Sequence, residues 1–348
     1  MRIGIITGKT DEISLDKEIN KKVAKKHYFY GSVQTDAALA YTIKEKFPNI
    51  TVDVIMPNEL SDERLQKNDI NYAVGYDIIY AINDDPYIKK FSGDDGFKVL
   101  DDIYFKKTNK IFPSYDFMGF IWDKKKYLEH LKKHNIPVTP SVFIKGNISL
   151  PQLIRFIQIK KWKEFIIKPN GGTIAIGLGK FNIDKCINDK SILKKYFDEN
   201  NQMFKEYIVQ ETIDGFMEYG EIKTYWIDGK FSYAVNTPGA TSPDQQYKVK
   251  EIIDKKVLSK CEEIGKNVIK ILPKISFNRK KVLPAMVRID FTCCKNNKKY
   301  SPINYFVNEI ESDIAGTYTN FPNIKYPMVD VMADTYVKKT RELYPKKG

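Results

Sequence analysis

The chain has 348 residues, of which 42% are hydrophobic, and its 57 Lys and Arg against 44 Asp and Glu give a formal net charge of +13. This length suffices for a large core and about two domains. No apolar run approaches the roughly 20 residues of a membrane-spanning helix, and the opening MRIGIITG is too short and too strand-like for a secretory signal. We therefore expect a cytoplasmic protein.

The positive charge is spread along the chain, mostly as Lys interleaved with Asn and Ile. A nucleic-acid-binding protein typically concentrates its basic residues in one patch, so nucleic acid is not the expected partner. An anionic small molecule or an acidic peptide is compatible with this charge. The four cysteines form no Cys-x-x-Cys pair, which argues against a zinc site and against a disulfide framework.

The amino-terminal part predicts an α/β unit over residues 1–115. RIGIIT reads as a buried strand, residues 34–47 as an amphipathic helix, and TVDVIM and NYAVGYDIIYAI as further strands. A linker follows over residues 116–140, with a helix over residues 123–134.

Two further regions follow the linker. Residues 141–215 predict a mixed α/β lobe with a helix near residues 190–200. Residues 216–348 include two strands joined at Asp228-Gly229, a dipeptide typical of type I′ hairpin turns. A helix within DKKVLSKCEEIGKNVIKIL, a second hairpin and a terminal helix near residues 326–342 complete this region.

The segment KEFIIKPNGGTIAIGLGKF, residues 163–181, is typical of a phosphate-binding loop. A β-rich run ends at Lys168 and Pro169, and glycines follow at positions 171, 172, 177 and 179. Glycines let backbone N–H groups approach an anion closely, and the lysine can place a point charge on a phosphate. A glycine-rich hairpin without any ligand has the same appearance, so both interpretations stay open here.

The strand EYIVQE ends in Gln210 and Glu211. A strand end with free backbone groups beside a carboxylate can read the edge of an adenine, and a second acid such as Glu221 can accept from ribose hydroxyls. Taken alone, these residues equally fit solvent-exposed positions at a strand end and in a loop.

Residues 286–311, MVRIDFTCCKNNKKYSPINYFVNEIE, predict a hairpin with Asp290 on its first strand and Glu309 and Glu311 on its second. Alternate strand residues share a face, so both glutamates point the same way and Asp290 can face them. Carboxylate oxygens are the hard ligands that suit Mg²⁺ or Mn²⁺. The alternative is that all three acids lie on the wet face of an antiparallel pair.

In this order the motifs resemble the ATP-grasp superfamily, especially carboxylate–amine ligases such as glutathione synthetase and D-alanine–D-alanine ligase. The matching strings run through most of the chain: WDKKK, KPNGG, VQETI, GEIK, and RID followed by NEIE. The resemblance implies the ATP-grasp fold of the α/β class. An amino-terminal α/β domain would precede a small lobe (residues 141–215) and a large lobe with the metal site (residues 216–348), with the nucleotide held between the lobes.

The resemblance also assigns roles to individual residues. The positions expected to contact ATP are Lys124, Lys168, Gly171, Gly172, Gln210, Glu211, Thr212, Ile213 and Glu221. The expected catalytic residues are Arg288, Lys223 and Lys248, and the expected metal ligands are Asp290, Glu309 and Glu311. Two departures stand out: Glu311 replaces the Asn of many ligases, and ESDIAGTY replaces the family's N-x-x-P-G-x-T.

The implied function is an ATP- and Mg²⁺-dependent ligase, with Mn²⁺ as the other candidate metal, which activates a carboxylate as an acyl phosphate and joins it to an amine. The carboxylate and amine substrates, small molecules or peptides, are not identified by the sequence. Family ligases are often dimers, which leaves a homodimer open. Two alternatives remain: an ATP-grasp kinase of a polyanionic small molecule, similar to inositol polyphosphate kinases, and a nucleotide-binding module without catalysis.

Overall fold

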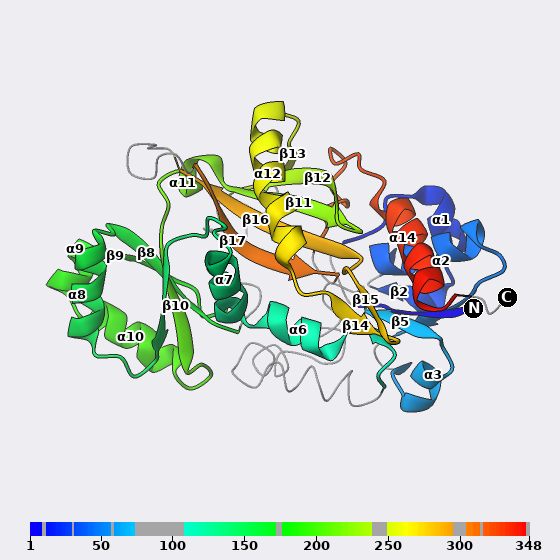
Figure 1. Ribbon diagram of the computed structural model, residues 1–348, viewed down its shortest axis with the longest axis horizontal. Coiled ribbons are helices and arrows are strands. Elements are labelled where there is room, and N and C mark those ends of the chain that lie inside the picture. The colour runs from blue at the N-terminus through cyan, green and yellow to red at the C-terminus, as the bar shows by residue number, and fades with distance from the viewer. Residues whose placement is uncertain are drawn as a thin grey trace.

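The computed structural model describes residues 1–8, 12–29, 31–56, 59–73, 108–171, 176–238, 249–294, 304–313 and 316–345. Three main sheets organise the protein, each with its own helices (Figure 1). Within these ranges no helix combines the length and the apolar character needed to cross a membrane.

The amino-terminal unit is built on a parallel sheet in the order β4-β1-β5-β6. Its strands are β1 (Arg2–Ile6), β4 (Thr51–Ile55), β5 (Ile70–Ala73) and β6 (Ile111–Phe112). Shorter elements beside it are α1 (Lys17–Lys22), η1 (Lys25–His27), β2 (Tyr28–Phe29), β3 (Ser32–Val33) and α3 (Asp62–Gln66). Parallel sheets are covered on both faces, which explains why four of the five residues of β1 and all four residues of β5 are buried.

The helix predicted at residues 34–47 is present as α2 (Thr35–Lys46), but its amino-terminal half is buried on all sides instead of amphipathic. The reason is the terminal helix α14 (Met328–Leu343), which packs against it (Figure 1). Tyr336 of α14 stacks on Tyr72 of β5 with ring centroids 4.1 Å apart. The carboxyl end of the chain thus completes the core of the amino-terminal unit.

The small lobe is built on an antiparallel sheet in the order β7-β10-β8-β9. Its strands are β7 (Ser141–Lys145), β8 (Glu164–Pro169), β9 (Gly179–Asn182) and β10 (Glu206–Glu211), and its helices are α8 (Leu150–Lys160), α9 (Ile183–Asn188) and α10 (Ser191–Asn200). The sequence indicated α10 alone. α8 carries Pro151 in its first turn and is followed by Lys161 in the left-handed conformation, both ordinary features of helix ends.

The large lobe is an antiparallel sheet in the order β13-β12-β11-β16-β17. Its strands are β11 (Glu221–Ile227), β12 (Lys230–Thr237), β13 (Lys250–Glu251), β16 (Met286–Cys293) and β17 (Tyr305–Ser312). The other elements are α11 (Phe216–Tyr219), α12 (Lys255–Ile271), β14 (Ile275–Phe277) and β15 (Lys280–Val282). The Asp228-Gly229 turn has φ values of 48° and 76°, which confirms the predicted hairpin with two left-handed residues.

Two linker helices join the units: α6 (Tyr115–Trp122) and α7 (Lys124–Lys133). Asp123 caps α7 by accepting from the Lys126 N–H at 3.0 Å. Leu128 and Leu131 of α7 are buried in one cluster with Ile208 of the small lobe and Ile289 of the large lobe. α7 therefore fixes the base of the two lobes relative to each other (Figure 1).

Candidate functional site

The acidic hairpin forms as the sequence predicts. β16 and β17 pair Asp290 with Glu309 and Arg288 with Glu311. The Arg288 fork binds both carboxylate oxygens of Asp290, Nε to Oδ1 at 2.8 Å and Nη2 to Oδ2 at 3.0 Å. Its Nη2 also lies 2.7 Å from Glu311 Oε1. One buried arginine thus neutralises two of the three acids.

Lys223 enters from the neighbouring strand β11, where its register partner is Asp290. Its Nζ lies 2.5 Å from Asp290 Oδ2 and 2.8 Å from Glu221 Oε2. Burial opposes the charge, but Asp290 and Glu221 outweigh it and hold the pKa of Lys223 well above its ordinary value. Asn308 donates to the other oxygen of Glu221 at 2.7 Å. Glu221 is therefore oriented from both sides.

Lys124 and Lys168 approach the same hairpin from the linker and the small lobe. Lys124 Nζ lies 3.2 Å from Glu309 Oε1. Lys168 is buried, and this burial lowers its pKa although Glu309 partly offsets the effect. Burial would raise the pKa of Glu309, but Lys124 and Lys168 keep it below its ordinary value. Charged side chains of the linker, the small lobe and the large lobe are therefore close together at this point: Lys124, Lys168 and Glu309.

Asp290, Glu309 and Glu311 fit a hard divalent cation by donor type. Their arrangement in this structure does not leave them open to a cation, because each carboxylate is paired with a lysine or arginine. Among the residues that the structure describes, no three His, Cys, Asp or Glu side chains are grouped so that they could hold a metal. Charge neutralisation by Arg288, Lys223 and Lys124 explains why the three acids can lie close together. Their role as metal ligands stays a prediction.

Gln210 lies on the face of β10 that turns toward the large lobe, the face it shares with Ile208. Ser141 donates its hydroxyl proton to Thr139 O at 2.6 Å, so it accepts from Gln210 Nε2 at 2.9 Å. This relay fixes the amide and leaves Gln210 Oε1 buried, with no hydrogen bond to any described residue. Such an acceptor suits a donor group of a ligand, for example the amino group of adenine.

The other predicted hinge residues are placed differently. Glu211 belongs to the opposite face of β10, since neighbouring side chains alternate. The N–H of Glu211 donates to Pro140 O at 2.9 Å and that of Thr212 to Glu164 O at 3.0 Å. These two N–H groups are therefore occupied, and the Ile213 side chain is buried. Contact of these residues with a base stays a prediction.

Gly171 begins the glycine-rich loop and lies against the linker. A Cβ at this position would come within 2.8 Å of Trp122 Nε1, so the indole requires a glycine here. Asn170, beside it, binds Asp123 Oδ1 at 2.9 Å. Two predicted site residues, Gly172 and Lys248, lie outside the described residues.

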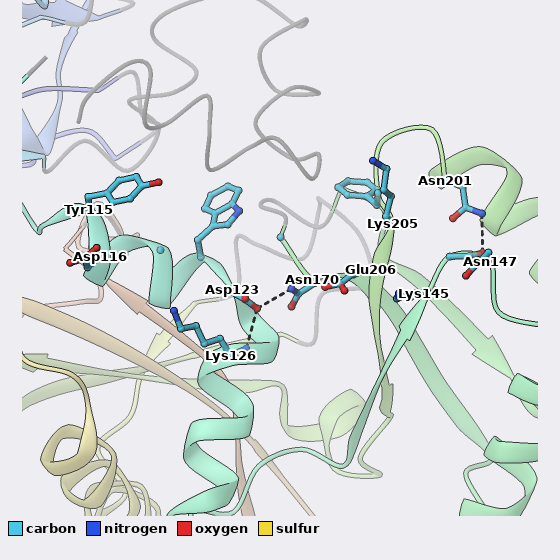
Figure 2. Close-up of a pocket in the computed structure, with 15 residues that line it drawn as sticks. Tyr115, Asp116, Asp123, Lys126, Lys145, Asn147, Asn170, Asn201, Lys205 and Glu206 are labelled. Carbon is cyan, nitrogen blue, oxygen red and sulfur yellow. Dashed lines mark hydrogen bonds between the residues drawn. The ribbon is translucent and has the colours of Figure 1, made fainter. Parts of the chain in front are cut away.

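A cavity of about 1130 Å³ opens beside this loop, between α6–α7 and the small lobe (Figure 2). Basic and acidic side chains line it in equal number: Lys126, Lys145, Lys205, Asp116, Asp123 and Glu206. Opposite charges also face each other across β7 and β10, where Lys145 pairs with Glu206. The cavity is large enough for a substrate, but its lining favours neither sign of charge.

The sequence reasoning missed the partners that orient these groups. Asn308 precedes Glu309 in the NEIE string, and strand alternation alone would place it on the opposite face. It reaches Glu221 because the register between β16 and β17 shifts at this point. Ser141 and Thr139 carried no signal in the sequence, because the bond from Gln210 to Ser141 depends on how β7 pairs with β10.

No protein-family model matches the chain, and no curated protein matches its sequence. Solved structures match nearly all of it. The structure of D-cycloserine synthetase DcsG aligns with a TM-score of 0.66 at 12% identity, over 98% of this chain and 100% of that chain. D-alanine–D-alanine ligase from Bacillus anthracis, complexed with ATP, aligns with a TM-score of 0.57 at 15% identity, over 100% of both chains.

The ATP-grasp ligase PsnB, complexed with minimal precursor, Mg and ADP, aligns with a TM-score of 0.56 at 12% identity, over 97% of this chain and 98% of that chain. At these identities the similarity establishes the fold and leaves the reaction open. The chain has the ATP-grasp fold and resembles, over nearly its whole length, the structures of ATP-grasp ligases.

Proposed function

We propose that the protein is an ATP-dependent ligase that activates a substrate carboxylate as an acyl phosphate and joins it to an amine, releasing ADP and phosphate. The observation that carries this proposal is a set of four basic side chains from three parts of the fold around one acidic hairpin. They are Lys124, Lys168, Lys223 and Arg288. Fixed cations beside hard carboxylates suit a triphosphate and its metal, because phosphoryl transfer depends on positioning and charge neutralisation.

The nucleotide would lie between the lobes. Lys124 and Lys168 would hold phosphate oxygens, and Glu221 would accept from the ribose hydroxyls. Gln210 Oε1, which has no donor among the described residues, supports an adenine at the hinge, because the 6-amino group of adenine is such a donor. Gly172 and Lys248 keep their proposed phosphate-side roles on the strength of the sequence motif alone.

Asp290, Glu309 and Glu311 would hold Mg²⁺ or Mn²⁺, which would supply positive charge against the negative charge that develops during phosphoryl transfer. Arg288 and Lys223, which pair with Asp290 and Glu311 in this structure, would be available to the transferred phosphoryl group. A guanidinium is suited to this because its planar fork binds two phosphate oxygens at once.

The reaction balances without a protein nucleophile. An oxygen of the substrate carboxylate bonds to the γ-phosphorus as the bond to the β,γ-bridging oxygen breaks, and ADP leaves with that electron pair. The amine nitrogen then bonds to the acyl carbon and loses a proton. Inorganic phosphate leaves with the electrons of the acyl C–O bond, and an amide remains.

The first test is thermal stability with ATP and Mg²⁺, compared with ATP and a chelator. A ligand that binds the native state raises the melting temperature by mass action. We expect a Mg²⁺-dependent rise that disappears in Lys168→Ala and persists in Lys163→Ala, an exposed lysine on the same segment. No rise in the wild-type protein would contradict the nucleotide site.

A screen of carboxylate and amine pairs for ADP release then tests the reaction. ADP release that requires both the carboxylate and the amine supports the ligase. ADP release with a polyanionic substrate alone, together with a stable phosphorylated product, would indicate the kinase. ATP binding without any turnover would indicate the binding module.

A further inference from the structure

Tyr318 lies in the loop after the acidic hairpin and has an unusual backbone. Its φ of 59° is in the left-handed region. Steric contact between Cβ and the carbonyl oxygen disfavours this region for every residue except glycine, and an aromatic residue there is an outlier. Such a conformation persists only where the surroundings impose it, and these places cluster at functional sites.

Glu12, from the amino-terminal unit, imposes this conformation. Its Oε1 accepts from the backbone N–H of Thr317 at 2.6 Å and of Tyr318 at 2.8 Å. Its Oε2 accepts from the Thr317 hydroxyl at 2.7 Å. One carboxylate therefore holds two successive N–H groups of the loop.

The large lobe holds the carbonyl groups of the same loop. The Tyr225 hydroxyl donates to Gly316 O at 2.6 Å, and the Tyr233 hydroxyl donates to Thr317 O at 2.8 Å. The two tyrosine rings are stacked with centroids 4.2 Å apart. The loop is thus fixed between two units of the fold, and Tyr318 has little freedom to leave its conformation.

The phenol of Tyr318 lies close to the charged groups of the candidate site, and Arg288 Nη1 donates to Gly316 O of the same loop at 3.5 Å. Burial raises the pKa of Tyr318, Lys223 and Arg288 lower it, and Asp290 and Glu311 raise it further. The hydroxyl makes no hydrogen bond with any residue in the described part of the chain. Packing beside Phe321, at 6.2 Å between centroids, explains an aromatic ring here but explains neither the hydroxyl nor the left-handed backbone.

We propose that Tyr318 is a catalytic residue whose phenol donates a hydrogen bond to an anionic oxygen of the phosphoryl group in transfer, and that Glu12 is the residue that positions it. This inference rests on the proposed function. A neutral donor suits this place, because Lys223 and Arg288 already supply the positive charge. The Tyr318 hydroxyl would be fixed in position before the substrate binds. A donor fixed in this way stabilises the transition state more than the ground state.

The test uses ADP and Mg²⁺ with aluminium fluoride, a mimic of the transferring phosphoryl group, and measures affinity with and without the fluoride. Tyr318→Phe keeps the ring and should leave the affinity for ADP and Mg²⁺ unchanged. The increase in that affinity on adding aluminium fluoride, here called the fluoride gain, should fall roughly 100-fold, the loss typical of one oxyanion donor. Tyr344→Phe, at a half-buried tyrosine that follows α14, is the matched control and should behave as wild type.

Glu12 variants separate positioning from folding. Glu12→Ala should reproduce the loss, whereas Glu12→Gln should retain most of the fluoride gain, because an amide oxygen can still accept from both N–H groups. Equal fluoride gains in wild type and Tyr318→Phe would overturn the proposal, as would a wild-type protein that binds ADP but shows no fluoride gain. Failure of the wild type to bind ADP or ATP at all would instead overturn the proposed function.

Discussion

Replacing Gln210 by Met should make the nucleotide-free protein more stable and its binding of ATP weaker. Gln210 is fully buried, and its Oε1 has no donor among the described residues. Leaving such an acceptor unpaired costs about 1–3 kcal/mol, whereas the bond from Nε2 to Ser141 contributes about 1 kcal/mol. Methionine has a similar volume and removes both. The net expectation is a gain of about 1 kcal/mol in the free energy of unfolding.

The same substitution removes the proposed partner of the adenine amino group. The loss of one hydrogen bond of about 1 kcal/mol corresponds to a roughly fivefold to tenfold weaker affinity for ATP. GTP should be affected less, because its oxo group at the same position offers no donor to Oε1. The Gln210→Met protein should therefore discriminate less between the two nucleotides.

Urea unfolding without nucleotide measures the first effect, and calorimetric titration with ATP and with GTP measures the second. Ser141→Ala is the control, because it frees the amide without removing it. The reasoning is refuted if Gln210→Met destabilises the protein and leaves ATP affinity unchanged, since Oε1 would then have a partner inside the protein.

Three further substitutions test other parts of the structure. Glu309→Gln should leave the protein folded by circular dichroism and abolish the Mg²⁺-dependent thermal shift with ATP; a retained shift would remove this residue from the proposed metal site. Gly171→Ala should lower stability by about 1–3 kcal/mol through its contact with Trp122, and a smaller residue at position 122 should restore it in a double-mutant cycle. Burial raises the pKa of Asp36 from 3.8 to about 7, so stability should fall by about 4 kcal/mol as the pH rises from 4 through 7. Asp36→Asn should flatten that part of the pH profile in urea unfolding.

The sequence alone determined the local geometry of the acidic hairpin and of the Asp228-Gly229 turn. Strand alternation predicts that Asp290 can face Glu309 and Glu311, and the structure pairs it with Glu309. A turn that needs two left-handed residues selects Asp-Gly. Both depend on residues close in sequence, whose spacing decides which face a side chain occupies. The order of motifs along the chain also indicated the ATP-grasp fold, which the similarity to solved structures confirms.

Tertiary structure decided what each of these side chains contacts. The acids that the sequence grouped as metal ligands are each paired with a basic residue, and the Lys124–Glu309 pair joins a linker helix to the large lobe. The amide of Gln210 is oriented by a strand far away in sequence. Periodicity reports which face of an element is buried, but it carries no information about the element that covers that face.

The loop around Tyr318 is another feature that the tertiary structure decided and the sequence did not. ESDIAGTY departs from the family pattern, and nothing in that string indicates a left-handed tyrosine or its partner. The conformation exists because Glu12, at the other end of the chain, accepts two N–H groups that local structure leaves free. A strained backbone is stabilised only by contacts from outside its own segment, so it becomes visible only in the folded protein.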